Sequence, residues 1–125
     1  MENLTMISRR FAALLGAFLL IEGIWGLFSP VVFGVLTTNI VHAIIHIFLG
    51  VTGLFAAPMR FSRGYLFGVG ALLLAVGILR FVPVASDLLV ALLNVNVPVA
   101  VFNIIVGLAS LSIAFTALRS RPATT

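Results

Sequence analysis

The stretch NIVHAIIHIFLGVTGLFAA, residues 39–57, decides the fold class. It is apolar over a length that can cross the hydrocarbon core of a bilayer as a helix, which takes about 17–25 residues. Its polar and small residues recur three and four positions apart, so they fall on one narrow stripe of the helix. This stripe comprises Asn39, His42, His46, Gly50 and Gly53. We expect it to face other helices, and we expect Ile47 to face lipid.

The whole chain has the same apolar character. Of its 125 residues, 62% are apolar or aromatic and 8% are charged, and the mean hydropathy is +1.32. So few charges cannot solvate the surface of an ordinary soluble domain. The composition therefore excludes a soluble enzyme, a disordered tail and a nucleic-acid-binding protein of the usual kind. The chain also has no cysteine, which excludes disulfides and thiolate chemistry.

Four apolar stretches have the length of a membrane span, and breaks rich in proline, serine or arginine separate them. We expect spans at about residues 8–28, 36–57, 64–83 and 97–119, within a single domain over residues 1–125. The apolar segment Ser86–Leu93 is too short to span, and Ser-Asp at its start is typical of a helix N-cap. The predicted fold class is an all-α membrane protein with four transmembrane helices and a short interfacial helix before the last span.

Arginine is unevenly distributed over this arrangement. With four spans, both termini and the loop between the second and third spans share one side of the membrane. That side carries six of the seven arginines, and the other side carries Arg80; the six are Arg9, Arg10, Arg60, Arg63, Arg119 and Arg121. The positive-inside rule then places both termini in the cytoplasm. We expect a multi-pass protein of a bacterial inner membrane.

The two halves of the chain resemble each other. Residues 16–24, GAFLLIEGI, align with residues 70–78, GALLLAVGI. In the second span of each half, Asn39, His46, Gly50 and Gly53 align with Asn96, Asn103, Gly107 and Ser110. The pattern predicts two tandem helical hairpins related by an axis along the membrane normal. Small residues allow membrane helices to approach closely, and we expect such contacts at Gly16, Gly23, Gly26, Gly50, Gly53, Gly70, Gly77 and Gly107.

Polar side chains gather at one predicted depth, in the outer half of the bilayer. With a helical rise of about 1.5 Å per residue, this polar layer comprises Glu22, Asn39, His42, His46, Arg80 and Asn103. An ionisable residue inside a membrane is by default a functional hypothesis. One interpretation is a structural network in which Arg80 or a protonated histidine compensates the charge of Glu22. The other is a proton relay or a cofactor site.

Two histidines four residues apart, together with a carboxylate, match common ligation of divalent metals. The sequence offers no fourth strong ligand, so we assign no particular metal or cofactor. His42 and His46 remain the candidate cofactor ligands. No arrangement typical of a catalytic triad, a phosphate-binding loop or paired catalytic carboxylates is present, and we name no catalytic residue.

The pattern Asn39-x-x-His42-x-x-x-His46-x-x-x-Gly50 resembles the signature of a bacterial four-helix membrane family catalogued as domain of unknown function 4383. The resemblance extends from the glycine-bearing first helix through residues 63–66, RGYL, to the last span. The histidine that the family carries on its fourth helix is Asn103 here, and the asparagine usual between the two histidines is Ala43. The resemblance implies a four-helix topology and assigns no activity.

The leading functional hypothesis is a small non-enzymatic integral membrane protein. It would be a structural or accessory subunit of a larger membrane complex or of a homo-oligomer, with lipid and other membrane helices as partners and no nucleic acid. One alternative is a small proton- or ion-coupled transporter or channel that uses the Glu/His layer. A second alternative is a redox- or pigment-associated subunit in which His42 or His46 is a ligand near haem, quinone or pigment.

Overall fold

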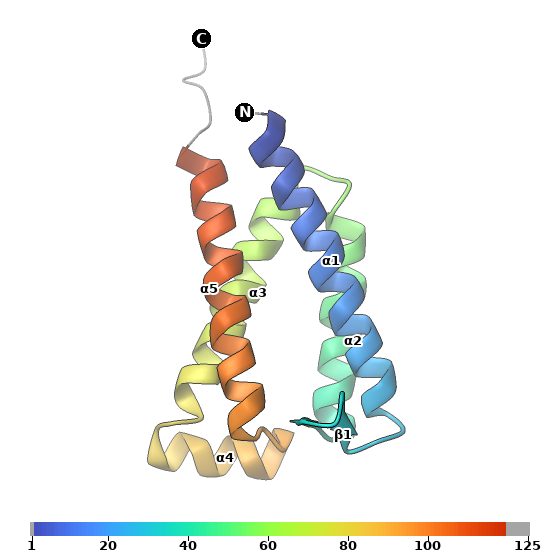
Figure 1. Ribbon diagram of the computed structural model, residues 1–125, viewed down its shortest axis with the longest axis vertical. Helices are drawn as coiled ribbons and strands as arrows, with labels where there is room; N and C mark the ends of the chain where they lie inside the picture. The colour runs from blue at the N-terminus through green and yellow to red at the C-terminus, as the bar shows by residue number, and fades with distance from the viewer. Residues whose placement is uncertain (1, 120–125) are drawn as a thin grey trace.

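The computed structural model describes residues 2–119, and the side chains of residues 6–116 (Figure 1). This part of the chain forms the helices α1 (Glu2–Gly26), α2 (Ile40–Ala56), α3 (Ser62–Leu79), α4 (Pro83–Leu93) and α5 (Val97–Arg119). The predicted helical fold class is confirmed. A small antiparallel hairpin between α1 and α2, β1 (Val31–Val32) and β2 (Leu36–Thr37), was not predicted.

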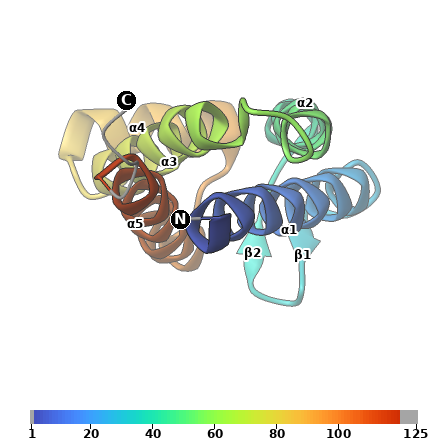
Figure 2. The same ribbon diagram turned by 90° about the horizontal axis from the view of Figure 1, so that it is seen from above.

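Four helices run roughly along the long axis of the molecule, and α4 lies across one end of them (Figure 1). Helix α1 packs mainly on α2, and α3 packs mainly on α5; contacts between these two pairs are fewer. Viewed from above, α1 lies beside α2, and α5 lies beside α3 (Figure 2). The start of α1, the α2–α3 connection and the end of α5 share one end of the molecule (Figure 1). The hairpin and α4 share the other end, which we call the hairpin end.

Glycines let the two backbones of each helix pair approach closely. A Cβ atom at Gly16 would lie 2.8 Å from the carbonyl oxygen of Gly50, and one at Gly50 would lie 2.5 Å from the backbone nitrogen of Leu20. In the other pair, a Cβ atom at Gly107 would lie 2.7 Å from the backbone nitrogen of Leu74. Since backbone atoms cannot yield as a flexible side chain can, any side chain at these positions would push the helices apart.

The other predicted packing glycines also lie against neighbouring segments. A Cβ atom at Gly23 would lie 2.7 Å from the carbonyl oxygen of Ala43, and one at Gly77 would lie 2.7 Å from that of Ala100. Ile47 packs against α1 at Gly23 and is half-buried, so its predicted lipid-facing position is wrong. The remaining glycines with close contacts are Gly26 against Thr38, Gly53 against Tyr65 and Gly70 against Ser110.

Helix α2 is shorter than the predicted span over residues 36–57. Leu36 and Thr37 pair in β2 instead of joining the helix. The side chain of Asn39 caps the helix, which therefore begins at Ile40. Residues 36–57 are mostly apolar, and hydropathy is the same for a strand as for a helix. Hydropathy alone therefore could not show that Leu36 and Thr37 belong to a strand.

The other boundaries differ by a few residues. Helices α1 and α3 begin before the predicted starts at residues 8 and 64 and end before residues 28 and 83, whereas α5 coincides with residues 97–119. The predicted short helix is α4, and it begins at Pro83 rather than Ser86. Proline suits the first turn of a helix because its φ is already fixed near the helical value. Ser86 therefore lies inside the helix and does not cap it.

Helix α2 buries its small and polar residues and exposes large apolar side chains. All the buried residues of α2 are small or polar: His42, Ala43, His46, Gly50, Gly53 and Ala56. On the same helix, Phe48 is 71% exposed and Phe55 is 68% exposed. Within the described residues, the segments Ser62–Leu79 and Val97–Thr116 are long and apolar enough to cross a membrane.

Two apolar clusters lie on either side of the polar layer. One contains Leu19, Leu66 and other residues toward the α2–α3 connection. The other lies at the hairpin end and includes Val32 and Val95. The polar side chains described next lie between these clusters.

Candidate functional site

Glu22 and His46 face each other across the contact between α1 and α2. The His46 Nδ1 atom lies 3.3 Å from Glu22 Oε1, and each side chain is 5% exposed. The two groups come this close because Gly23 brings the backbone of α1 against α2. The second carboxylate oxygen, Oε2 of Glu22, is buried and has no hydrogen-bond partner. The structure thus brings together two residues of the predicted polar layer and leaves one buried oxygen without a partner.

His42 is fixed at the first turn of α2 by two interactions. Its backbone N–H donates to Asn39 Oδ1 over 2.9 Å, which satisfies one of the free donors at the helix start. Its ring Nδ1 lies 2.9 Å from the carbonyl oxygen of Leu93, at the end of α4. Because a carbonyl can only accept, Nδ1 of His42 carries the proton. The ring centroids of His42 and His46 are 4.2 Å apart, edge to face.

Arg80 does not compensate the charge of Glu22 as the sequence suggested. Its Nε donates to the carbonyl oxygen of Val95 over 2.7 Å, and its Nη1 donates to Ser86 Oγ over 2.8 Å. Among the residues whose side chains are described, the group that the carboxylate of Glu22 contacts is the imidazole of His46. The guanidinium instead ties together the end of α3, α4 and the segment before α5. This role was not visible in the sequence, because the partner groups include a backbone carbonyl.

Asn103 completes the layer from the side of α5. It is 4% exposed, and it lines a cavity of about 90 Å³ between the two helix pairs. The cavity is also lined by His42 and His46 of α2, and its other lining residues are Ile45, Leu49, Leu72, Leu73, Val76 and Leu93. The two imidazoles and one amide are thus the polar groups of an otherwise apolar chamber.

Asparagines tie α4 and the start of α5 to the hairpin end of α2. Asn39 Nδ2 donates to the carbonyl oxygen of Leu92, and Asn94 Nδ2 donates to that of Thr38. Asn96 caps α5, as its aligned counterpart Asn39 caps α2. We did not predict a role for Asn94; it has φ 52° at the end of α4, and asparagine after a run of apolar helical residues is a signal for such a helix end.

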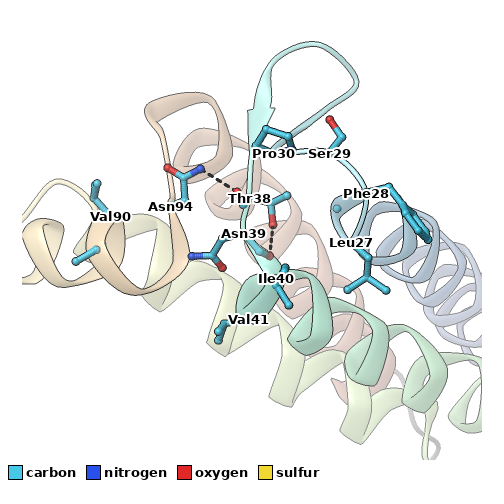
Figure 3. Close-up of a pocket in the computed structure, with 12 residues that line it drawn as sticks. Leu27, Phe28, Ser29, Pro30, Thr38, Asn39, Ile40, Val41, Val90 and Asn94 are labelled. Atoms are coloured by element: carbon cyan, nitrogen blue, oxygen red, sulfur yellow. Dashed lines mark hydrogen bonds between the residues drawn. The ribbon is translucent and has the colours of Figure 1, made fainter.

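Figure 3 shows a second, larger hollow at the hairpin end, between the end of α1, the start of α2 and α4. Its volume is about 720 Å³. Its lining is mostly apolar, and Leu27, Phe28 and Ile40 are among the side chains drawn. Its polar groups bond to one another, since Asn94 donates to Thr38. A ligand in this groove would therefore find mostly apolar surface and few polar atoms free to form hydrogen bonds.

The site as a whole is a set of hydrogen-bonding groups enclosed by apolar helices. No cluster of three or more histidine, aspartate or glutamate side chains close enough to hold a metal is present within the described residues. The Glu22–His46 pair can share a proton, and imidazole nitrogens that make no other contact can accept a hydrogen bond or bind a metal.

The described residues form a small helical protein with two apolar helices of membrane-spanning length and a layer of buried polar side chains. The model of the family described as Domain of unknown function (DUF4383) matches residues 9–116. The chain therefore belongs to this family, as its histidine signature predicted. Searches of curated proteins and of solved structures give no match.

Proposed function

We propose that the protein is an integral membrane protein in which α1, α2, α3 and α5 are the four spans. The observation that carries this proposal is that α1 and α2 bury polar side chains and expose large apolar ones. Glu22 is 4% exposed, whereas Leu14 on the same helix is 69% exposed. In water this arrangement would leave large apolar side chains solvated. In lipid it is favourable, because polar groups must find partners inside the protein.

The arginines support one orientation in the membrane. Arg9 and Arg10 lie in the first half of α1, and Arg60 and Arg63 lie at the α2–α3 connection. These segments share one end of the molecule with the end of α5 (Figure 1); Arg121 lies outside the described residues. Arg80 lies toward the opposite end. By the positive-inside rule the first end is cytoplasmic, and α4 rests at the outer surface.

Matched contacts support a duplicated helical hairpin. The contact of Gly23 with Ala43 has its counterpart in the contact of Gly77 with Ala100, with the same 2.7 Å spacing. The caps of α2 and α5 are also aligned asparagines. Helix α2 has 17 residues, or about 25 Å at the usual rise. A span of this length is accommodated by local thinning of the bilayer or by its flanking segments.

Within the membrane, the protein acts as a structural or accessory subunit rather than an enzyme. Little of the described chain extends beyond the helices, so partners must contact helix surfaces. These surfaces carry large apolar side chains, and Phe28, Phe48 and Phe55 are among the most exposed. Such surfaces suit lipid and other membrane helices, in a larger complex or a homo-oligomer.

Single cysteines test the insertion and the orientation, because the chain has no cysteine of its own. We would introduce Val35→Cys and Asp87→Cys at the hairpin end and Met59→Cys at the α2–α3 connection, and treat intact bacterial cells with a membrane-impermeant maleimide. The first two variants should react in intact cells, and the third only after permeabilisation. Labelling of Met59→Cys in intact cells, or recovery of the variants in the soluble fraction, would contradict the proposal.

A further inference from the structure

One buried amide, that of Asn103, lines the small cavity next to His42 and His46. The amide of Asn103 makes no side-chain hydrogen bond within the described residues, although the residue is 4% exposed. Glu22 contacts His46 from outside the cavity lining, and its Oε2 is also buried without a partner. Buried polar groups are nearly always satisfied in native proteins, so an amide without a partner beside two imidazoles calls for a bound ion or water. This observation points to a ligand.

For each imidazole, the hydrogen bonds show which ring nitrogen is not engaged by another protein group. Nδ1 of His42 is held by the carbonyl oxygen of Leu93, and Nδ1 of His46 faces the carboxylate of Glu22. Neither ring makes another hydrogen bond within the described part of the chain, so the Nε2 atom of each ring remains available. Metal-binding histidines typically use one nitrogen for the metal and direct the other at a carbonyl or a carboxylate. In this protein His42 directs its Nδ1 at a carbonyl, and His46 directs its Nδ1 at a carboxylate.

The size and chemistry of the cavity select the class of ligand. Its volume of about 90 Å³ is well below the roughly 300–1,000 Å³ of typical cofactor pockets, which argues against haem, quinone or a pigment inside it. A water molecule takes up about 30 Å³ of the liquid, so the cavity has room for a metal ion with one or two water ligands. Imidazole nitrogens favour zinc, copper and nickel over magnesium or calcium.

We propose that His42 and His46 bind one divalent late transition-metal ion of the zinc class through their Nε2 atoms. Asn103 supplies the third protein group in the cavity, and water completes the coordination. Glu22 is a positioning residue, since its carboxylate orients the His46 ring and provides a compensating negative charge. The proposal rests on α2 and α5 lining the same cavity in the proposed membrane bundle, and it gives the accessory subunit a metal ion between its helix pairs.

The test uses the full-length protein without an affinity tag, purified in mild detergent, with Zn²⁺ as the probe. His42 and His46 are the only histidines of the chain, so a histidine-dependent signal has one origin. Isothermal titration should give one Zn²⁺ per chain, and X-ray absorption at the zinc edge should show two imidazole ligands. His42→Gln and His46→Gln should each weaken binding at least 100-fold, and Glu22→Gln should weaken it about 10–100-fold. The control Asp87→Asn removes an exposed carboxylate and should leave the affinity unchanged.

Two results would overturn the proposal. The first is a wild-type protein that binds no stoichiometric Zn²⁺, or binds it without imidazole ligands in the absorption spectrum; water alone would then satisfy the polar groups. The second is unchanged affinity in the His42→Gln, His46→Gln double variant. Circular dichroism of each variant without metal separates a lost ligand from a lost fold. The cysteine-labelling experiment needs no metal. A negative result for Zn²⁺ binding would therefore overturn the metal site and leave the proposed membrane topology to be judged by the labelling alone.

Discussion

Replacing Gly50 by alanine should loosen the contact between α1 and α2. The added Cβ would lie 2.5 Å from the backbone nitrogen of Leu20 and 2.7 Å from the carbonyl oxygen of Gly16. Both neighbours are backbone atoms, so the helices themselves must separate. Inserting a methyl group into a packed contact costs about 1–3 kcal/mol. Alanine recovers about 0.5–1 kcal/mol because glycine is the poorer helix former, and a net loss of up to about 2.5 kcal/mol is expected.

The chain provides a matched control for this substitution. Gly68 lies on α3, and a Cβ atom there would have no atom of another segment within 4 Å, so Gly68→Ala should be neutral or stabilising by up to about 1 kcal/mol. Gly107→Ala should resemble Gly50→Ala, because its Cβ would lie 2.7 Å from the backbone nitrogen of Leu74. The free energy of unfolding is measured by titrating the purified protein in detergent with sodium dodecyl sulfate, followed by far-UV circular dichroism. Equal stability of Gly50→Ala and Gly68→Ala would refute the reasoning.

Three further substitutions test individual contacts by the same titration. Tyr65→Phe removes the 2.7 Å hydrogen bond from the tyrosine hydroxyl to the carbonyl oxygen of Leu49 and should cost about 0.5–1.5 kcal/mol; no change would show that this bond is not formed. Asn94→Ala loses the bond to Thr38 and places alanine at φ 52°, so a loss of about 1–3 kcal/mol is expected, and Asn94→Gly should recover part of it. Glu22→Gln keeps a polar partner for the neighbouring imidazole and should unfold within about 1 kcal/mol of the wild type, whereas Glu22→Ala should cost about 1–3 kcal/mol. If both Glu22 variants unfold alike, the carboxylate is not bonded as described.

The helices could be predicted from the sequence because they depend on long apolar runs. The stripe of Asn39, His42 and His46 also predicted the buried face of α2, since spacing on a helix determines which residues share a face. All three lie as the stripe requires, with Asn39 at the cap and both imidazoles buried. The predicted depth likewise placed Glu22 near His46.

The hairpin and the role of Arg80 could not be predicted in the same way. A strand of two residues has too little periodicity to distinguish it from the start of a helix. Arg80 donates to the carbonyl oxygen of Val95. Every residue has a backbone carbonyl, so residue types cannot predict which one accepts this bond. The lipid-facing position of Ile47 failed because the close approach at Gly23 widens the buried face of α2 beyond the stripe.

Whether the exposed apolar surface of α2 faces lipid can be measured most directly with spin labels. Phe48→Cys and Phe55→Cys, two of the most exposed positions of the helix, would carry nitroxide labels in protein reconstituted into bilayers. Electron paramagnetic resonance then compares collisions with oxygen, which concentrates in hydrocarbon, and with a water-soluble nickel chelate. Our account predicts high accessibility to oxygen and low accessibility to the chelate at both positions. High accessibility to the chelate at either position would contradict a lipid-facing helix and the membrane bundle built on it.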